Sequence, residues 1–566
     1  MWTTGRHHVW TWLVGGLIAG LVVGCAPPAD RSAAERSAPQ DTRPAAPKRA
    51  TMAMMGNPPT VVQRTIGGIS GNIPGIVQLE QVLSPGLSAP VDGGTRRALL
   101  ADAVPTVENG QWVVLADGRM ETTWRIRQGA RWHDETPITA EDVLFTAKID
   151  QDREFPIPRD PAYEAIERMD AVDAQTLKIT WKRPFIEADQ YMTGALFPRH
   201  LLEKTYDEAK STLMNLPYWT TDYVGTGPYK VREWVRDSHV VLEATDSYPL
   251  GRPRIDELTV RFIEDENAFM ASILAGAVDV SLGKSITLEQ TLALKSQWAD
   301  GHVEITPTTA MKLWPQLLDA NPQILTNLQL RKALLHGLDR QEMVETIMGG
   351  LSEVAHSVLL PNEPETKEVD AAIVKYPFDA RRATSMIENL GYARGPDGIY
   401  RDAAGQRLSL EVNATAEDQN TKPMFAVKDY WQRIGVEVDA LVIPVQRQRD
   451  LEYRATFPAF SLSGGPSGVA AVKNQISSQA RLPETRYTGN NYSRYMNPEF
   501  DALVDRYLTT VPWSQRMEAL RAAVRHMTDQ LPQMNLYYAT TSVMVANKMT
   551  NVGVGATWNV YEWDIN

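Results

Sequence analysis

The sequence predicts an α/β protein made of several domains. The clearest observation is a strand-helix-strand unit, in which Leu408–Asn413 and Val436–Val442 have the apolar content of strands and the segment around Met424–Ile434 has apolar residues at helical spacing. A second is the alternation of strands with a helix between Tyr229 and Ser281. The third is length, because 566 residues are too many for one ordinary domain. Ordinary globular values of 43% hydrophobic and 22% charged residues allow a large core.

The stretch from Val224 to Val280 has the densest pattern in the chain. It opens with the tight turn Val224-Gly225-Thr226-Gly227-Pro228, and two further turns separate short segments with alternating apolar residues. A helical segment then ends at Gly276, because glycine suits the position after a helix. We expect strands at Tyr229–Trp234, Val240–Ala244, Glu257–Ile263 and Val278–Ser281, and a helix at Asn267–Leu274.

The N-terminus has the pattern of an export signal. Arg6 precedes an uncharged apolar run, Val9–Gly24, which is shorter than the roughly 20 residues of a spanning helix. The run ends at Val22-Val23-Gly24-Cys25, the pattern of a lipoprotein cleavage site, and Cys25 is the only cysteine of the chain. We therefore predict a signal peptide over residues 1–24 and a diacylglycerol on the Cys25 thiol. The alternative is an incidental thiol at the end of a membrane anchor.

The next segment, residues 25–56, is predicted to be a disordered tether. Residues 26–50 are rich in Ala, Pro, Ser and Arg without apolar periodicity, so they cannot bury enough surface to offset chain entropy. We expect the fold to begin near Thr60 with a strand, Val61–Ile66, that leads into a glycine-rich turn containing Gly68 and Ser70. A phosphate-binding loop is the alternative for this turn, but the Lys-Ser/Thr ending of a P-loop is missing.

Residues 95 to 215 are predicted to form an inserted domain. Thr122–Arg127 alternates as a strand, and Thr139 with Asp142 forms a capping box for a helix from Ala140 to about Asp150. Between them, His133-Asp134 has no second His or Cys at ligand spacing, so we expect a structural role and no metal site.

The remainder of the chain is predicted to be a second α/β region. Met311–Pro315 is expected to cross between domains, with Trp314 lining a binding cleft. Helix signals recur downstream, where Asp339 and Asp379 stand at N-cap positions and Gly349-Gly350 and Gly391 at the ends. Further elements are expected as helices at Leu328–His336, from Asn497-Pro498 and at Gln515–Gln530, and as a strand at Leu536–Tyr538.

A Ser/Gly segment is the main candidate for contact with a ligand. Phe460, Ser461 and Ser463 belong to a run that ends in Gly464-Gly465-Pro466-Ser467-Gly468, and no acidic residue lies between Ala455 and Glu484. Such a run offers hydroxyl and backbone hydrogen bonds but no negative charge. A flexible surface turn is an equally good interpretation. Four residues downstream form a polar-aromatic group that could face the same cleft: Tyr487, Asn490, Asn491 and Tyr492.

These motifs together resemble a known family. VGTGPYKVREW, VVLEATDSY and GRPRIDELTVRFIEDENAFMASILAGAVDV, with WHDETP before the helix at Ala140, are similar to the bacterial extracellular solute-binding proteins, family 5, the peptide-binding components of ABC importers. The resemblance runs from about Thr60 to about Val545. Glu135 stands where the family usually has glycine, and the family's aromatic-Asn pair near Trp314 is missing. Peptide-binding members often carry an Asp in the Phe460–Gly468 region that pairs with the peptide's α-ammonium, and this chain has none.

The resemblance implies a two-lobe, periplasmic-binding-protein-like α/β fold with an extra inserted domain. The first lobe would be discontinuous, and the glycine-rich turn at Gly68 and Ser70 would belong to its ligand-facing side. The implied boundaries are residues 57–94, 216–310 and 526–566 for the first lobe, 95–215 for the inserted domain and 311–525 for the other lobe.

The implied function is capture of a peptide or similar small solute, and its delivery to the permease and ATPase subunits of an ABC importer. A monomer that is exported and lipid-anchored at the periplasmic or extracytoplasmic face is expected, with no cofactor. The net charge of −12, or −13 without residues 1–24, argues against nucleic acid as a partner. Two alternatives keep the fold, a sensing or chaperone receptor and a binder of sugars or other small molecules. An enzyme is not supported, because no nucleophile motif or metal cluster is visible.

Overall fold

The computed structural model describes residues 46–65, 73–91, 95–152, 154–155, 162–284, 286–553 and 555–566. The chain divides into two units, Met1–Ala46 and Pro47–Asn566, and all of the described helices and strands belong to the second. The predictions for the signal peptide, Cys25, Gly68 and Ser70 lie outside the described residues. No helix within the described ranges has both the length and the apolar character needed to cross a bilayer.

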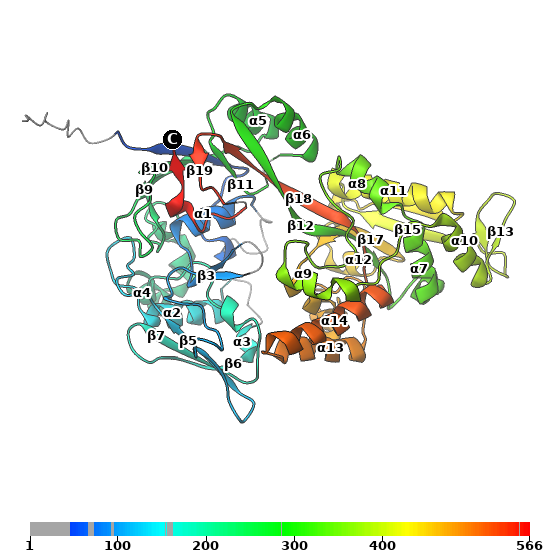
Figure 1. Cartoon of the computed structure of the whole chain (residues 1–566), viewed down its shortest axis with the longest axis horizontal. Coiled ribbons are helices and arrows are strands. Elements are labelled where there is room, and N and C mark those ends of the chain that lie inside the picture. The colour runs from blue at the N-terminus through cyan, green and yellow to red at the C-terminus, as the bar shows by residue number, and fades with distance from the viewer. Residues whose placement is uncertain are drawn as a thin grey trace, which may run out of the picture. The chain divides into compact units, whose positions relative to one another are not determined.

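A mixed ten-stranded sheet is the centre of the structure (Figure 1). Both chain ends of the described unit contribute to it, since β1 near the start and β18 near the end lie two positions apart in the strand order. In that order its strands are β16 (Glu437–Val442), β15 (Ser409–Ala414), β17 (Phe460–Gly465), β12 (Gly301–Pro315), β18 (Met534–Ala546), β11 (Val280–Leu282), β1 (Arg49–Met54), β10 (Glu257–Phe262), β9 (His239–Ala244) and β8 (Tyr229–Val235).

Two long antiparallel strands connect the two halves of this sheet. β12 pairs with β18 from Gly301, opposite Ala546, to Leu313, opposite Met534, with two register shifts on the way. One apolar core gathers residues from β1, β8, β9, β10 and the end of β18, whereas a second gathers residues from β12, β15, β17 and the start of β18. Val303 of β12 also packs against the first core, so both strands take part in both cores.

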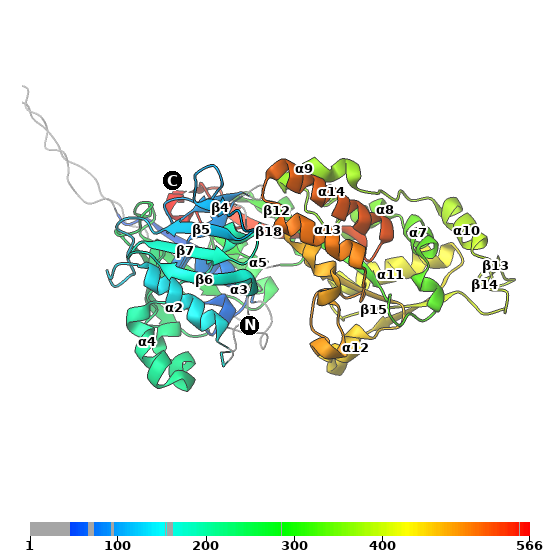
Figure 2. The same cartoon turned by 90° about the horizontal axis from the view of Figure 1, so that it is seen from below.

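A separate four-stranded sheet, in the order β4-β5-β7-β6, carries the third core. Helix α2 (Ala140–Gln151) contacts β6 and β7 (Figure 2). The predicted cap is confirmed, because the Asp142 carboxylate accepts hydrogen bonds from the Thr139 N–H and hydroxyl at 2.8 and 2.9 Å. The strands are β4 (Trp112–Val114), β5 (Met120–Arg125), β6 (Ile166–Ala171) and β7 (Thr176–Trp181).

Most helices lie where local signals predict them. The Asp339 and Asp379 carboxylates accept from the N–H groups of Glu342 and Arg382, each at 2.9 Å, so both predicted N-caps are confirmed. The remaining helices are α1 (Ile76–Leu83), α3 (Ala162–Ala165), α4 (Arg199–Glu208), α5 (Glu266–Leu274), α6 (Leu288–Gln297), α7 (Leu328–His336), α8 (Arg340–Ile347), α9 (Pro364–Val369), α10 (Ala380–Asn389), α11 (Asp418–Arg433), α12 (Leu451–Ala455), α13 (Pro498–Thr509) and α14 (Trp513–Gln530).

The start of the fold differs from the prediction. Arg49–Met54 is strand β1, paired in parallel with β10 and β11, so the expected disordered tether over 25–56 is wrong for this part. Its apolar residues Met52, Ala53 and Met54 are fully buried. The expected strand at Val61–Ile66 is also wrong as far as Thr65, where the Thr65 N–H and hydroxyl both donate to the Val62 carbonyl and close a tight turn.

The region around His133 has a structural role. The Gly225 N–H donates to His133 Nδ1 at 3.0 Å and Nε2 lies 3.1 Å from the Gly227 carbonyl, so the ring fastens the glycine-proline turn. Burial lowers the pKa of His133 to about 4, which keeps the ring neutral. Nearby, Glu135 has φ 69°, the left-handed conformation that glycine adopts without cost.

Candidate functional site

The candidate site lies where β17 ends beside β12. β15 is parallel to both β16 and β17, and the carboxyl ends of parallel strands are the usual place for ligands in open α/β sheets. Antiparallel pairing of β12 with β17 sets Leu313 opposite Leu462, and both are in the apolar core. The alternate residues therefore share the other face, where Lys312 stands opposite Ser463 and Trp314 opposite Ser461.

An aromatic stack forms on this second face. The rings of Trp314 and Tyr492 are stacked with centroids 4.8 Å apart, and Trp314 Nε1 donates to Ser463 Oγ at 3.0 Å. Arg481 covers the other side of Tyr492, with its Cζ 3.6 Å from the ring centroid. The hydrogen bond from Trp314 satisfies the single donor of its indole ring, and together with the stacking on Tyr492 it restrains the ring. The stack is thus a rigid wall with a cation at one end.

A second cation, Lys312, stands at the other end. Its Nζ lies 5.2 Å from the centroid of the Trp314 ring and donates to the Pro466 carbonyl at 2.5 Å. Lys312 is 0% exposed, and burial lowers its pKa to about 7. Among the described residues, no carboxylate forms a salt bridge with Lys312 or Arg481. The site is therefore electropositive.

The structure sorts the residues predicted for ligand contact. Trp314, Ser461, Ser463 and Tyr492 are brought together, although Trp314 is only 1% exposed. The prediction that Phe460 contacts the ligand is wrong. Phe460 is fully buried on the core face, and its ring centroid lies 5.0 Å from that of Trp431. The first part of the Ser/Gly run, Phe460–Gly465, is strand β17 and not a flexible turn or a loop.

The downstream polar group is mostly structural. Asn491 is fully buried, and its amide donates to three backbone carbonyls, those of Gln475, Ile476 and Tyr495. Tyr487 donates its hydroxyl to Glu452 at 3.0 Å. Asn490 makes a long contact of 3.4 Å with Asn474. Tyr487 and Asn490 remain predictions as ligand contacts, whereas Asn491 holds its own segment in place.

Lys312 and Arg481 were not among the site residues predicted from the sequence. The position of Lys312 between Met311 and Leu313 is a detectable signal, because a lysine flanked by apolar residues in a buried strand is rare. Arg481 has no such local signal. Its contact with Tyr492 depends on a chain reversal in which Arg486 and Tyr487 both have positive φ, 52° and 57°.

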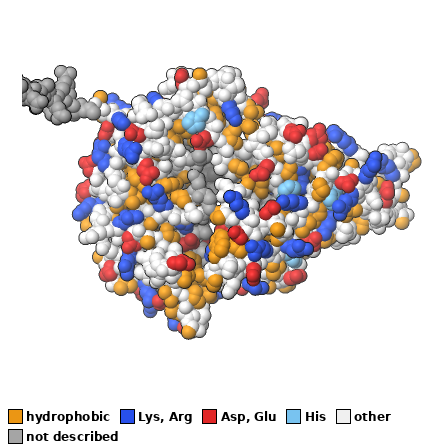
Figure 3. Space-filling model, in the orientation of Figure 1, with side chains coloured by type: hydrophobic (Ala, Val, Ile, Leu, Met, Phe, Trp, Pro, Cys, Tyr) orange, Lys and Arg blue, Asp and Glu red, His pale blue; other side chains and the backbone are white. Residues whose placement is uncertain are grey.

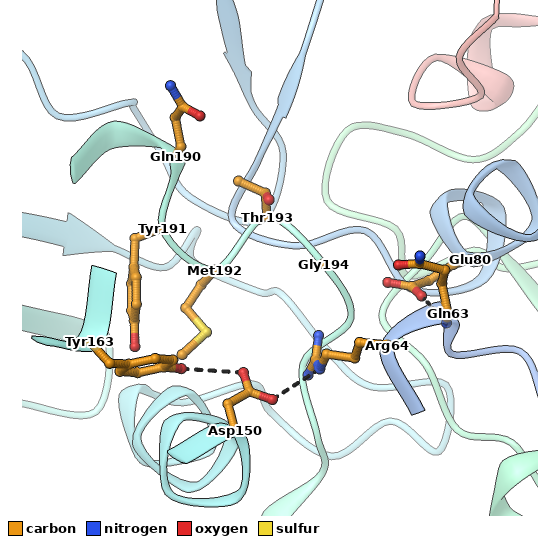
Figure 4. A pocket seen from close by; sticks show the side chains of 10 residues that line it. All are labelled: Gln63, Arg64, Glu80, Asp150, Tyr163, Gln190, Tyr191, Met192, Thr193 and Gly194. Carbon is orange, nitrogen blue, oxygen red and sulfur yellow. Dashed lines mark hydrogen bonds and ion pairs between the residues drawn. The ribbon is translucent and has the colours of Figure 1, made fainter. Parts of the chain in front are cut away.

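A polar cavity of about 190 Å³ lies elsewhere in the unit (Figure 4). Arg64 is at its centre, with Nε 3.0 Å from Asp150 Oδ1 and an amino group donating to the Ala195 carbonyl. The Glu80 carboxylate accepts from the N–H groups of Gln63 and Ala195. Burial raises the pKa of Glu80, opposed by the Arg64 charge. The charges of this cavity are paired with one another, so it joins segments of the fold.

Comparison with known proteins identifies the family. The sequence profile of the bacterial extracellular solute-binding proteins, family 5, middle region, matches residues 104–478. This chain belongs to that family. Two relatives from Bacillus subtilis (strain 168) are similar over most of their length. The oligopeptide-binding protein AppA is 24% identical over 436 residues, 75% of this chain and 76% of AppA. The oligopeptide-binding protein OppA is 23% identical over 515 residues, 85% of this chain and 89% of OppA.

Solved structures of low sequence identity show the same fold. The oligopeptide-binding protein from Thermus thermophilus, complexed with a pentapeptide, superposes with a TM-score of 0.68 at 20% identity, covering 91% of this chain and 96% of that one. NikA from Brucella suis in complex with Fe(III)-EDTA has a TM-score of 0.73 at 17% identity, covering 92% and 100%. The two-lobe α/β fold of these family 5 solute-binding proteins is therefore the fold of this chain.

Proposed function

We propose that the chain is the substrate-binding lipoprotein of an ABC importer, which captures a peptide or similar small solute and delivers it to a membrane permease. The observation that supports this most is the wall of Trp314, Tyr492 and Ser463 at the carboxyl end of β17 in a family 5 solute-binding protein. Peptides are held through backbone hydrogen bonds and roomy pockets, and an aromatic wall beside hydroxyl groups suits them.

Binding is proposed to occur between a discontinuous first lobe and the lobe of residues 311–525. Residues of the inserted segment already contact that second lobe, since the Ile186 N–H donates to the Leu508 carbonyl at 3.1 Å and Glu187 pairs with Lys473. Closure of the two lobes would then rearrange such contacts between them. β12 and β18 would stay paired and connect the lobes during this motion. The closed form would be what the permease recognises.

The lipid on Cys25 would keep the binding unit at the membrane, where the permease and ATPase subunits are. The surface suits a monomer in an aqueous compartment, because acidic and basic side chains are interspersed over the face seen in Figure 3. Capture requires no chemical step, so the chain acts by binding and not by catalysis.

Native mass spectrometry of the purified protein tests the proposal. A peptide bound at one copy per chain, released when the protein is unfolded, is the expected result. A sugar, a metal chelate or another non-peptide solute at the same stoichiometry would refute the peptide and leave the binding role. A protein that shows no bound solute and takes up none from a peptide mixture would refute both.

A further inference from the structure

Lys312 is a buried lysine whose hydrogen-bonding groups are only partly satisfied. A lysine ammonium has three N–H donors. Lys312 Nζ uses one for the Pro466 carbonyl, and no other acceptor contacts it within the described part of the chain. Two buried arginines of the same region, Arg331 and Arg494, differ. Arg331 donates to the carbonyls of Leu325, Thr326 and Gln530. Arg494 forms a salt bridge with the carboxylate of Asp319. Among the described residues, Lys312 is thus less well satisfied than Arg331 and Arg494.

The polar row in which Lys312 stands has a further unsatisfied group. Across the sheet, Lys312 lies between Ser463 of β17 and Asn535 of β18, directly opposite each. Asn535 is 7% exposed, and its side-chain oxygen has no hydrogen-bond partner among the described residues. Opposed residues of antiparallel strands share a face. An unmade donor of Lys312 and an unmade acceptor of Asn535 therefore stand side by side.

The charges around this row do not neutralise it. Arg481, at the far end of the aromatic stack, is itself buried, and Arg454 adds to the positive potential there. Glu363 is near the same loop, but its carboxylate accepts from the N–H groups of Val469 and Leu360. Glu452 accepts from Tyr487. A cationic ligand group would add to the positive charges of Lys312, Arg481 and Arg454, whereas an anionic one would supply the missing acceptors.

The turn that contacts Lys312 Nζ is partly exposed. Gly464 and Gly465 are half-buried, Pro466 is exposed, and the Pro466 carbonyl is the group that holds Nζ. Ser467 Oγ accepts from the Ala310 N–H at 2.8 Å and fixes the far end of this turn. A ligand carboxylate that replaced the Pro466 carbonyl would approach Lys312 from this side of the sheet, because the apolar core lies on the other face.

We infer that this row is an anion subsite, in which Lys312 binds a carboxylate of the ligand and Asn535 accepts a hydrogen bond from a neighbouring N–H of it. That the ligand is a peptide rests on the proposed function. For a peptide, the carboxylate that binds Lys312 is the terminal one or one of a side chain. The subsite excludes the α-ammonium, because two cations already stand at the two ends of the aromatic stack.

Tryptophan fluorescence titration of the purified protein with five probes tests this. Four are one pentapeptide of neutral side chains with either end free or capped, by acetylation of the amine and amidation of the carboxylate. The fifth is Fe(III)-EDTA, a polycarboxylate that is not a peptide. Wild type is compared with Lys312→Met and with the control Lys332→Met, which removes a lysine paired with Asp529.

The expected result is that amidation weakens binding to wild type and to Lys332→Met by about tenfold or more, and changes binding to Lys312→Met by less than about twofold. The anion subsite would be overturned, and the peptide function left standing, by either of two results. One is a peptide affinity for wild type that amidation does not change, and the other is a loss of affinity on amidation that is equally large in Lys312→Met. Binding of Fe(III)-EDTA alone, lost in Lys312→Met, would refute the peptide and support the subsite. If wild type binds none of the five probes, both are refuted.

Discussion

Replacing Lys312 by Met should make the protein more stable, by an amount that depends on pH. The side chain is fully buried, and methionine has a similar unbranched shape without the charge. Removal of the bond to the Pro466 carbonyl opposes this gain by about 1 kcal/mol. The larger effect is the ammonium itself, which burial makes unfavourable in the folded state.

The size follows from the depressed pKa of Lys312. A fall from the ordinary lysine value of 10.5 to about 7 in the fold is a penalty of about 5 kcal/mol below pH 7, where the ammonium is charged in both states. Above pH 7 the folded protein loses this proton while the unfolded chain keeps it until about pH 10. Wild-type stability therefore rises with pH across that window. Between pH 7 and pH 9 the rise from this one group is about 2 kcal/mol.

Urea denaturation at pH 7, 8 and 9, followed by tryptophan fluorescence, measures the effect. The advantage of Lys312→Met over wild type should shrink by about 2 kcal/mol across the series. The same substitution at the exposed Lys422, measured at each pH, controls for the loss of a lysine side chain. A constant difference between wild type and Lys312→Met would show that Lys312 has an ordinary pKa, and the reasoning from its burial would be wrong.

Four further outcomes are expected. Cys25→Ser should abolish incorporation of labelled palmitate and release the protein from the membrane fraction, and label retained by the variant would contradict lipidation. Acetylating the N-terminus of a bound peptide should leave its affinity unchanged or improve it in calorimetry, because a buried unpaired ammonium costs several kcal/mol; strong preference for the free amine would contradict this. Adding the bound solute should lower the radius of gyration in small-angle scattering, and an unchanged radius would count against lobe closure. Glu135→Gly should raise stability by about 1 kcal/mol in thermal unfolding, since φ is 69° there, and a loss would show that its bond to Ser247 outweighs the strain.

Local signals in the sequence were sufficient for many elements. Asp339, Asp379 and the Thr139-Asp142 pair mark helix starts through bonds within four residues, so they can be recognised without knowing the fold. The strand-helix-strand unit that ends in β16 is also confirmed, with β15 and β16 parallel. β1 was missed because its burial depends on β10 and β11, which lie some two hundred residues later in the chain.

The site was predicted only in part, for the same reason. The tryptophan of β12 and the hydroxyls of β17 were recognised by residue type, but their shared face depends on an antiparallel register between strands about 150 residues apart. That register also decides that Phe460 is a core residue and that Lys312 and Asn535 are neighbours. Periodicity within one strand gives its two faces but not which face meets a ligand.

We propose that the chain captures a solute for import. Uptake of the labelled solute that copurifies with the protein, measured in cells with the chain, without it and with it restored, tests this most directly. We expect that uptake falls when the chain is removed and returns when it is restored. Uptake that is the same in all three, for a solute that the purified protein binds, would contradict the import role and favour a sensing receptor.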